Sequence, residues 1–495
     1  METYEICVLG SGSGGYAAAM RAVDFGKKVC IIEGGEIGGA GVKWGALASK
    51  TMWELAKDFA IASKRDRGYH CDSLTVDYQT VRSTVIDAIH EKQDQMLCQI
   101  EAFTAKSKKG PGILTLKRGW GAFLSPETVI VRGASHETEE IHAQKFLIAT
   151  GSKPRNFPDI EVDQKRILNS DGILNLKEFP KRLLIIGAGI VGCEYASIFS
   201  NFKQTKVYLI DHEKRILPYE DKDISDFVGA NLMKNGVTIL HSAKLTDLIE
   251  KDHHLEVVLA TDNDEMTKIE IDVILFSIGR SPQLSRLKLK NANIAPDEDG
   301  YLSTDKNCCI KNNIYAAGDV THYPNLVNIA ELEGRNAVKH MLGLRPSPIN
   351  YTNMATSMFF YPPVAAVGLN EKQCQQKKIP YRVGFYSNVL LSRAIAMRSL
   401  NGFVKIIVSD DKKQKILGMR SAGSQVTSTI MSIAMLLDQA KGLRDAVRPI
   451  YPHPTMSEGI QECLRLLLGE SVYKPHAFPE FVKIRTWDPD KGYRL

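Results

Sequence analysis

Two stretches of the chain share one order of apolar runs, glycines and a closing acidic residue. In the first, an apolar run over Glu5–Leu9 predicts a strand, an alanine-rich stretch over Tyr16–Phe25 predicts a helix, and Lys28–Ile32 predicts a second strand ending at Glu33. The turn before the helix reads Gly-Ser-Gly-Ser-Gly-Gly over 10–15. A strand, a glycine turn, a helix and an acidic strand end in this order predict a dinucleotide-binding fold.

Three glycines of this turn have separate physical roles. Gly10 permits the tight turn, Gly12 lets the backbone approach a pyrophosphate, and Gly15 allows the helix to pack closely on the strand. The unpaired N–H groups at the helix N-terminus then face the phosphates. Glu33 is placed to accept hydrogen bonds from the hydroxyls of a ribose.

The same pattern returns in the middle of the chain. Lys181–Ile186 predicts a strand, 187–192 (GAGIVG) a glycine turn, Cys193–Phe202 a helix, and Lys206–Ile210 a strand that ends at Asp211. An internal repeat of this kind predicts two bound dinucleotides. A chain that holds two such ligands usually passes a hydride between them.

Seven motifs follow one another in the order found in the flavin-dependent pyridine nucleotide–disulfide oxidoreductases, and the chain resembles that family over about residues 4–468. They are GSGSGG at 10–15, ATG at 149–151, GAGIVG at 187–192, SIGRSP at 277–282, YAAGDVT at 315–321, PPVAAVG at 362–368 and HPTMSE at 453–458. The family includes dihydrolipoamide dehydrogenase, glutathione reductase and the soluble transhydrogenases. The resemblance implies FAD in the first fold and NADH or NADPH in the second.

The resemblance also implies which residues hold the two cofactors, and it implies no metal ligands. For FAD these are Gly10, Gly12, Ser13, Gly14, Gly15, Glu33, Lys50, Ala122, Thr150, Gly151 and Asp319. For NAD(P) they are Gly187, Gly189, Gly192, Glu194, Asp211 and Gly279. Asp319 would hold the ribityl and pyrophosphate region, and a helix beginning near Val327 would direct its positive end at the flavin.

The implied fold class is α/β, with two Rossmann-like dinucleotide-binding domains and a C-terminal α+β interface domain. We expect a discontinuous FAD-binding domain at 1–154 and 276–345, interrupted by an NAD(P)-binding domain at 155–275. Residues 346–468 would form the interface domain of a homodimer. Residues 469–495 have no counterpart in the family pattern and are expected to form a C-terminal extension.

The family's redox-active dithiol is missing from this chain. Disulfide reductases of the family carry the segment G-G-x-C-x-x-x-x-C-x-x-S-K after the second strand, and here Gly41 and Ala46 occupy the two cysteine positions. Neither side chain can form a thiolate or a mixed disulfide. Reduction of lipoamide, glutathione or trypanothione by the family's route is therefore not expected. The adjacent Cys308 and Cys309 are interpreted as packed or loop thiols.

Two candidate catalytic pairs remain. Lys50 matches the family lysine beside flavin N5, and Glu194 matches the glutamate that pairs with it, so that a cation stabilises the charge that develops during hydride transfer. His453 and Glu458 match the family's C-terminal acid–base pair, which reaches the site of the other subunit. Without a cysteine to protonate, both catalysis and interface packing stay open for His453.

The end of the second fold favours NADH over NADPH. A 2′-phosphate beside the Asp211 carboxylate would meet like charge, at a cost of about 4 kcal/mol for two unit charges at ~4 Å and an effective dielectric near 20. Lys214 and Arg215 follow closely and could turn back onto a phosphate, but solvated surface charge is the expected use of these two side chains.

Three functions are compatible with these residues. In the first, reduced flavin passes electrons directly to a small-molecule acceptor such as a quinone, and Lys43 and Trp44 line the space that the thiols vacate, unless Trp44 fills it as core. The second is transhydrogenase-like hydride exchange, suggested by Trp44-Gly45 and by GCEYASIF at 192–199, although His453 and Asp211 depart from that pattern. The third is a non-enzymatic FAD- and NAD-binding scaffold or sensor.

Composition narrows the class of protein further. The chain is 44% hydrophobic and 24% charged with a net charge of +6, and it shows no basic run that would indicate nucleic-acid binding. No apolar run reaches the ~18 residues of a membrane span. A strand that begins almost at the first residue leaves no room for a signal peptide, and nine scattered cysteines suggest reduced thiols. We therefore expect a cytoplasmic protein.

Overall fold

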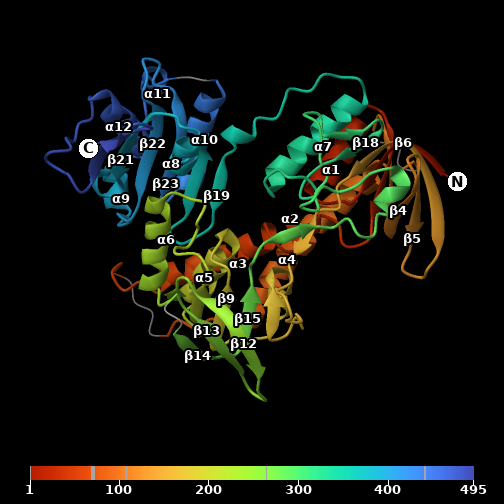
Figure 1. Cartoon of the computed structure of the whole chain (residues 1–495), viewed down its shortest axis with the longest axis horizontal. Coiled ribbons are helices and arrows are strands. Elements are labelled where there is room, and N and C mark those ends of the chain that lie inside the picture. Colours follow the sequence, from red (N-terminus) through yellow and green to blue (C-terminus); the bar gives the residue numbers. More distant parts are fainter. Residues whose placement is uncertain (1, 69–72, 106–109, 263–264, 440–441, 495) are drawn as a thin grey trace. The chain divides into compact units, whose positions relative to one another are not determined.

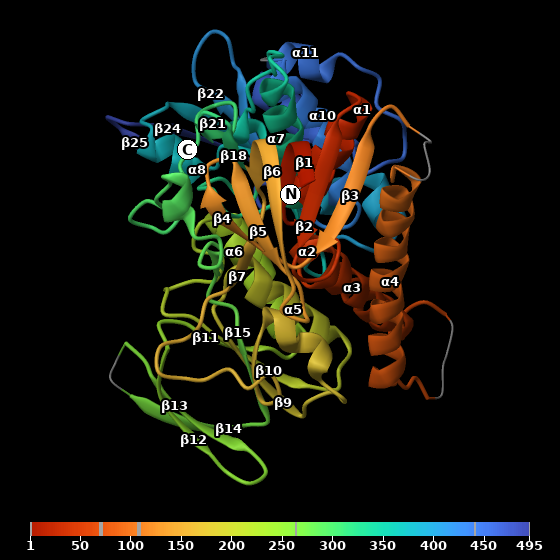
Figure 2. The same ribbon diagram turned by 90° about the vertical axis from the view of Figure 1, so that its right-hand side faces the viewer.

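The computed structural model describes residues 2–68, 73–105, 110–262, 265–439 and 442–494, and it divides into two compact units. The first unit takes residues up to 55, 75–178 and 278–349. The second takes 56–74, 179–277 and 350 onward. Figures 1 and 2 show the elements of both units, coloured along the sequence.

The first unit is built on a mostly parallel sheet with the strand order β17-β18-β6-β1-β2-β3. The strands are β1 (Glu2–Leu9), β2 (Lys28–Glu33), β3 (Ile113–Arg118), β6 (Thr138–Ile148), β17 (Cys309–Lys311) and β18 (Ile314–Ala316). An antiparallel pair, β4 (Trp120–Ser125) and β5 (Thr128–Arg132), joins the sheet through β6. The central strands are apolar on both faces because helices and loops cover both.

Two helices of this unit, α1 (Ser13–Asp24) and α7 (Val327–Met341), lie side by side (Figure 1). Glycines allow their close approach, because a β-carbon on Gly334 would lie 2.2 Å from the carbonyl oxygen of Gly14. The expected helix near Val327 is therefore present, and its N-terminus lies beside the first glycine turn, where a β-carbon on Gly14 would lie 3.0 Å from Ala330 O.

The second unit contains the repeated fold. Its parallel strands are β9 (Arg182–Ile186), β10 (Lys206–Ile210), β11 (Thr238–Leu240) and β15 (Val273–Phe276), with helices α5 (Ile190–Asn201) and α6 (Lys222–Lys234). A three-stranded antiparallel meander follows in the same unit (Figure 2): β12 (Lys244–Glu250), β13 (Leu255–Ala260) and β14 (Met266–Ile271).

A seven-stranded antiparallel sheet in the second unit has the order β19-β20-β23-β22-β21-β24-β25. Its strands are β19 (Thr356–Met358), β20 (Val364–Gly368), β21 (Tyr381–Ser387), β22 (Phe403–Ser409), β23 (Ile416–Ala422), β24 (Val482–Asp488) and β25 (Gly492–Arg494). Helices α10 (Val426–Asp438) and α12 (Glu458–Leu468) pack on it. The residues expected to form an extension, 469–495, thus add β24 and β25 to this sheet beside β21.

The remaining elements are shorter or connect the sheets. They are α2 (Gly39–Lys43), α3 (Leu47–Ala62), α4 (Tyr78–Ala102), β7 (Ser152–Pro154), β8 (Ile167–Asn169), β16 (Arg280–Pro282), α8 (Glu371–Gln376), α9 (Ser392–Ala396) and α11 (Leu443–Val447). Strands β7 and β16 pair antiparallel, and Arg280 of β16 pairs with Asp171. Residues 155–178 belong to the first compact unit. No helix in the described part of the chain is long and apolar enough to cross a membrane.

The α/β fold class with two dinucleotide-binding folds and a C-terminal α+β domain is confirmed. The predicted strands and helices of both glycine-turn units are present, with ends that differ by a few residues. The helices begin earlier than predicted, at Ser13 and Ile190, because the last glycines of each turn already belong to the first helical turn.

Candidate functional site

The first glycine turn has the geometry of a phosphate cradle. Gly10 has φ of +103°, and a β-carbon on it would lie 2.4 Å from the carbonyl oxygen of Ala149. A β-carbon on Gly15 would lie 2.0 Å from Gly10 O, so the helix can start here only with glycine. By contrast, the β-carbon position of Gly12 has no heavy atom within 4 Å. This open space in front of the α1 N-terminus, which has no side-chain cap, fits the pyrophosphate of FAD.

The second glycine turn repeats this geometry. Gly187 has φ of +102°, with a β-carbon position 2.6 Å from Ser277 O, and the β-carbon position of Gly192 lies 1.9 Å from Gly187 O. Gly189, like Gly12, faces open space within 4 Å. The residues therefore fit a second dinucleotide at the N-terminus of α5.

The acidic strand ends are tied to their own glycine turns in the same way. Glu33 Oε2 accepts hydrogen bonds from the N–H of Ser11 at 2.7 Å and from its hydroxyl at 2.6 Å. Asp211 Oδ2 accepts from the N–H of Ala188 at 2.6 Å, and its Oδ1 accepts from the N–H of Glu213 at 3.0 Å. Both carboxylates are thus oriented by backbone donors at the position that the sequence assigns to the ribose.

Asp319 belongs to a polar chain that sequence reasoning did not find. The hydroxyl of Ser152 donates to Asp319 Oδ2 at 2.5 Å, and Arg280 Nε donates to Ser152 Oγ at 2.8 Å. Arg280 also pairs with Asp171 at 3.1 Å. Ser152 directly follows the ATG motif and Arg280 lies inside SIGRSP. Their positions in or beside these motifs were the sequence signal that could have linked them to the FAD site.

Among the other residues predicted to bind FAD, Thr150 lies beside the first glycine turn, with its Cα 3.3 Å from the β-carbon position of Gly10. Ser13 is the first residue of α1, and Ala122 is buried in β4. Thr150 donates its hydroxyl hydrogen to Gln283 O at 2.8 Å, and Gly151 has φ of +68°, which favours glycine. Gly279, predicted for NAD(P), has φ of +99°.

Lys50 and Glu194 are each held in place by polar contacts. Lys50 Nζ donates to Ser49 Oγ at 3.2 Å, near the start of α3. Glu194 is buried in α5, and its Oε1 accepts from the N–H of Phe359 at 2.9 Å. The two residues belong to different compact units, so the pairing between them stays a prediction.

His453 and Glu458 form the predicted pair. His453 Nδ1 and Glu458 Oε1 are 2.7 Å apart, and the imidazole is 66% exposed. Glu458 is the first residue of α12, and its Oε2 also accepts from the N–H of Thr455 at 2.8 Å. The carboxylate is therefore fixed by the backbone and can orient the ring, as a general acid–base group requires.

The segment without cysteines forms α2 and the start of α3. A β-carbon on Gly41 would lie 2.8 Å from Ser13 Oγ, so little space is left beside this residue. Lys43 forms an ion pair with Glu36, and its ammonium also lies 4.4 Å from the ring centroid of Trp44. Burial would raise the pKa of Glu36, but Lys43 lowers it below the ordinary value. Lys43 is therefore a paired cation beside a half-buried indole.

The cysteines show no redox pair among the described residues. Eight described cysteines are free, and Cys71 lies outside the described residues. Cys308 is buried, and burial raises the pKa of its thiol to about 12. Burial likewise raises the pKa of the Cys309 thiol. Both are poor nucleophiles, consistent with packed or loop thiols.

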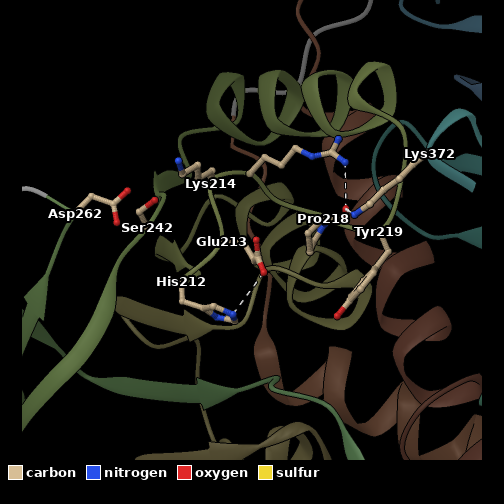
Figure 3. A pocket seen from close by; sticks show the side chains of 9 residues that line it. His212, Glu213, Lys214, Pro218, Tyr219, Ser242, Asp262 and Lys372 are labelled. Carbon is tan, nitrogen blue, oxygen red and sulfur yellow. Dashed lines mark hydrogen bonds and ion pairs between the residues drawn. The ribbon is translucent and has the colours of Figure 1, made fainter. Parts of the chain in front are cut away.

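A cavity of about 470 Å³ opens beyond the acidic end of β10 (Figure 3). It is lined by His212, Glu213, Lys214, Arg215, Pro218, Tyr219, Ser242, Asp262 and Lys372. Arg215 is not turned back toward a phosphate. Its guanidinium donates to Pro218 O at 3.1 Å, to Glu220 O at 2.6 Å and to Ser225 Oγ at 3.0 Å, which closes the loop after β10.

Comparison with known proteins finds matches over most of the chain. The family model described as pyridine nucleotide-disulphide oxidoreductase matches residues 4–334, and the dimerisation-domain model of this family matches residues 354–464. The dihydrolipoyl dehydrogenase of Bacillus subtilis is 31% identical, covering 95% of this chain and 99% of that protein. The dihydrolipoyl dehydrogenase of Chlamydia muridarum is 30% identical, covering 96% and 99%.

Solved structures show the same architecture. The Cu(II) complex of the HOCl-induced flavoprotein disulfide reductase RclA from Escherichia coli has a TM-score of 0.82 at 25% identity and covers 94% of this chain and 100% of that chain. LpdA from Mycobacterium tuberculosis has a TM-score of 0.85 at 24% identity, with coverage of 94% and 100%, and shows the fold alone.

Proposed function

The chain belongs to the pyridine nucleotide-disulphide oxidoreductase family, and on this premise we propose that it transfers electrons from NADH through FAD directly to a non-disulfide acceptor such as a quinone. The family supports an FAD-dependent NAD(P)H oxidoreductase with a dimerisation domain. When bound, FAD supplies a ring that accepts a hydride and donates electrons onward.

One observation carries this proposal. Both glycine turns leave open space at Gly12 and Gly189 for a nucleotide, yet no cysteine occurs between Cys30 and Cys71, where the family's dithiol segment lies. The hydride-accepting half of the family's reaction is thus retained without the relay to a disulfide. Lys50 would hold a positive charge near the reacting atoms, and buried Glu194 would orient it.

The contacts of Arg215 support NADH as the electron donor. Its guanidinium donates to two carbonyl oxygens and a hydroxyl, so Arg215 is not available for bidentate hydrogen bonds to a 2′-phosphate. The Asp211 carboxylate accepts two backbone N–H bonds, which orient it at the position expected for the ribose. It would accept a hydrogen bond from a 2′-hydroxyl and repel a 2′-phosphate.

The acceptor proposal rests on the segment around Gly41 and Ala46. In this segment the Trp44 indole is half-buried and the paired ammonium of Lys43 lies beside it, so these two side chains would line an acceptor site left open by the missing thiols. An aromatic wall suits a planar, electron-poor acceptor. In a homodimer, the exposed His453 would face the partner's site with Glu458 orienting its ring.

An anaerobic experiment tests the proposal. The FAD-loaded protein is mixed with NADH or NADPH, bleaching of the visible flavin absorbance is followed, and benzoquinone, lipoamide or NADP⁺ is then added. We expect rapid bleaching by NADH and reoxidation by the quinone but not by lipoamide. Reoxidation by NADP⁺ alone would indicate transhydrogenase activity instead. A bound flavin that neither nucleotide reduces would contradict the proposal and indicate a scaffold or sensor.

A further inference from the structure

Residues 215–223 follow the acidic end of β10, and part of this segment contacts the second glycine turn at 187–192. The N–H of Leu217 donates to the carbonyl oxygen of Ala188 at 2.9 Å, directly within that turn. Pro218 and Tyr219 form part of the wall of the cavity shown in Figure 3. A displacement of this segment would therefore change both the turn and the cavity beside it.

Residues of the seven-stranded sheet domain form a hydrogen bond and an ion pair with this segment. Asn370 Nδ2 donates to the carbonyl oxygen of Tyr219 at 2.8 Å. Arg420, only 4% exposed, pairs through Nε with Glu220 Oε2 at 3.0 Å. These contacts lie within one compact unit, so the coenzyme fold and the sheet domain are joined at this loop.

A buried charge cluster also links the sheet domain to the end of this segment. Lys405 of β22 is fully buried, and its ammonium pairs with Asp221 at 2.9 Å, with Asp223 at 2.7 Å and with Glu371. Asp221 and Asp223 stand at the start of α6, at the end of the returning segment. Three carboxylates around one ammonium leave excess negative charge where Lys405, Asp221 and Glu371 are buried, so a second cation would stabilise the cluster.

The C-terminal extension supplies that cation. Arg485 of β24 pairs with Asp223 at 2.7 Å and with Glu371. The hydroxyl of Tyr493 in β25 donates to Glu371 Oε2 at 3.3 Å, and that of Tyr381 donates to the same oxygen at 3.2 Å. The extension thus reaches the coenzyme fold through its side chains as well as extending the sheet.

We propose that the C-terminal extension is a positioning element for the nicotinamide coenzyme. Arg485 completes the charge cluster that anchors Asp221 and Asp223, and this anchor keeps the 215–223 segment in the shape that binds the adenosine half of NAD(H). The inference rests on the proposed use of NADH by the second fold, and it is independent of the identity of the electron acceptor.

The test compares three variants of the FAD-loaded full chain. Arg485→Met removes the charge, Arg485→Lys keeps it, and Lys491→Met removes an exposed cation from the same extension as a matched control. Dissociation constants for NAD⁺ and ADP-ribose are measured by calorimetry. KM for NADH and kcat are measured with ferricyanide as the acceptor.

For Arg485→Met we expect Kd for ADP-ribose and KM for NADH to rise about tenfold, within the usual range of coupling between sites, while kcat at saturating NADH and FAD content stay unchanged. Arg485→Lys should recover part of the affinity, and Lys491→Met should match the parent protein. An unchanged Kd in folded Arg485→Met would overturn the inference.

If Arg485→Met does not fold, a second variant tests the inference. Tyr493→Phe removes the hydroxyl that bonds Glu371 at 3.3 Å, Gln375 at 2.8 Å and Tyr381 at 3.2 Å but leaves the charges in place, and we expect Kd for ADP-ribose to rise about twofold to fivefold. No change in Kd would contradict the inference. A parent protein that binds neither NAD⁺ nor ADP-ribose would instead refute the coenzyme assignment on which the inference rests.

Discussion

Asp211 Oδ2 accepts the N–H of Ala188 at 2.6 Å, so the acidic end of one strand is fixed directly to the glycine turn of the strand before it. Glu33 and Ser11 form the matching bond in the first fold at 2.7 Å. Because the backbone donor orients each carboxylate, each fold holds a fixed negative charge where a ribose would bind. Selectivity between NADH and NADPH should depend on this charge in the second fold.

Replacing Asp211 with Arg should shift coenzyme preference toward NADPH. The change removes the repulsion of a 2′-phosphate and adds an attractive charge, so the ratio of kcat/KM for NADPH to that for NADH should rise at least about tenfold, equivalent to about 1.4 kcal/mol. Steady-state kinetics with ferricyanide measure both efficiencies. Lys214→Ala is the control for a general change of charge in this loop, and an unaltered ratio in Asp211→Arg would refute our interpretation of the strand end.

Replacing Lys50 with Met should slow reduction of the flavin by NADH. The substitution keeps most of the side-chain volume but removes the charge expected beside the reacting atoms, and the loss should be about 10²-fold or more. Stopped-flow absorbance under anaerobic conditions measures this step by itself. Lys57→Met, on the same helix α3, controls for loss of a cation, and an unchanged rate in Lys50→Met would remove Lys50 from the mechanism.

Restoring cysteines at Gly41 and Ala46 should create a long-wavelength thiolate–flavin absorbance band on partial reduction. The side chain at position 41 must displace Ser13 Oγ, which would lie 2.8 Å from its β-carbon, but this oxygen is the end of a small rotatable side chain. The control Gly41→Ala with Ala46→Ser has similar volume without thiols. Absence of the band in the double-cysteine variant would mean that position 46 does not lie over the flavin.

The charge cluster around Lys405 should make stability depend on pH in acid. Burial would raise the pKa of Asp223, but Lys405 and Arg485 lower it from 3.8 to about 2. A carboxylate with a lowered pKa stabilises the fold above its unfolded pKa, and this stabilisation is lost as pH falls from about 4 to about 2. The amount is about 2 kcal/mol, at 1.36 kcal/mol for each pKa unit.

Thermal unfolding of the parent protein and of Asp223→Asn between pH 2 and 7 measures this contribution. The parent should unfold at the higher temperature near neutral pH, and the two midpoints should converge as pH approaches 2. Asp226→Asn, an exposed carboxylate on the same helix, should show a much smaller difference. A gap between parent and Asp223→Asn that stays constant down to pH 2 would contradict the lowered pKa.

The sequence by itself determined the two glycine turns and their strands, helices and acidic ends. These features depend on local conformation: Gly10 and Gly187 need positive φ, and Gly15 and Gly192 lie within van der Waals contact of a carbonyl a few residues away. Such requirements are met by neighbouring residues, so they appear as short motifs. The replacement of both thiols by Gly41 and Ala46 was likewise visible without any structure.

Only the tertiary structure decided which distant residues complete these sites. Ser152 and Asp319 are 167 residues apart, and Arg485 and Asp223 are 262 apart, so no local pattern connects them. The extension after residue 469 shows only scattered aromatic and charged residues in sequence, and its strands acquire partners because β21 leaves an edge free for β24. Charged side chains such as Lys405 become buried only where folding gathers opposite charges around them, and that gathering depends on the whole fold.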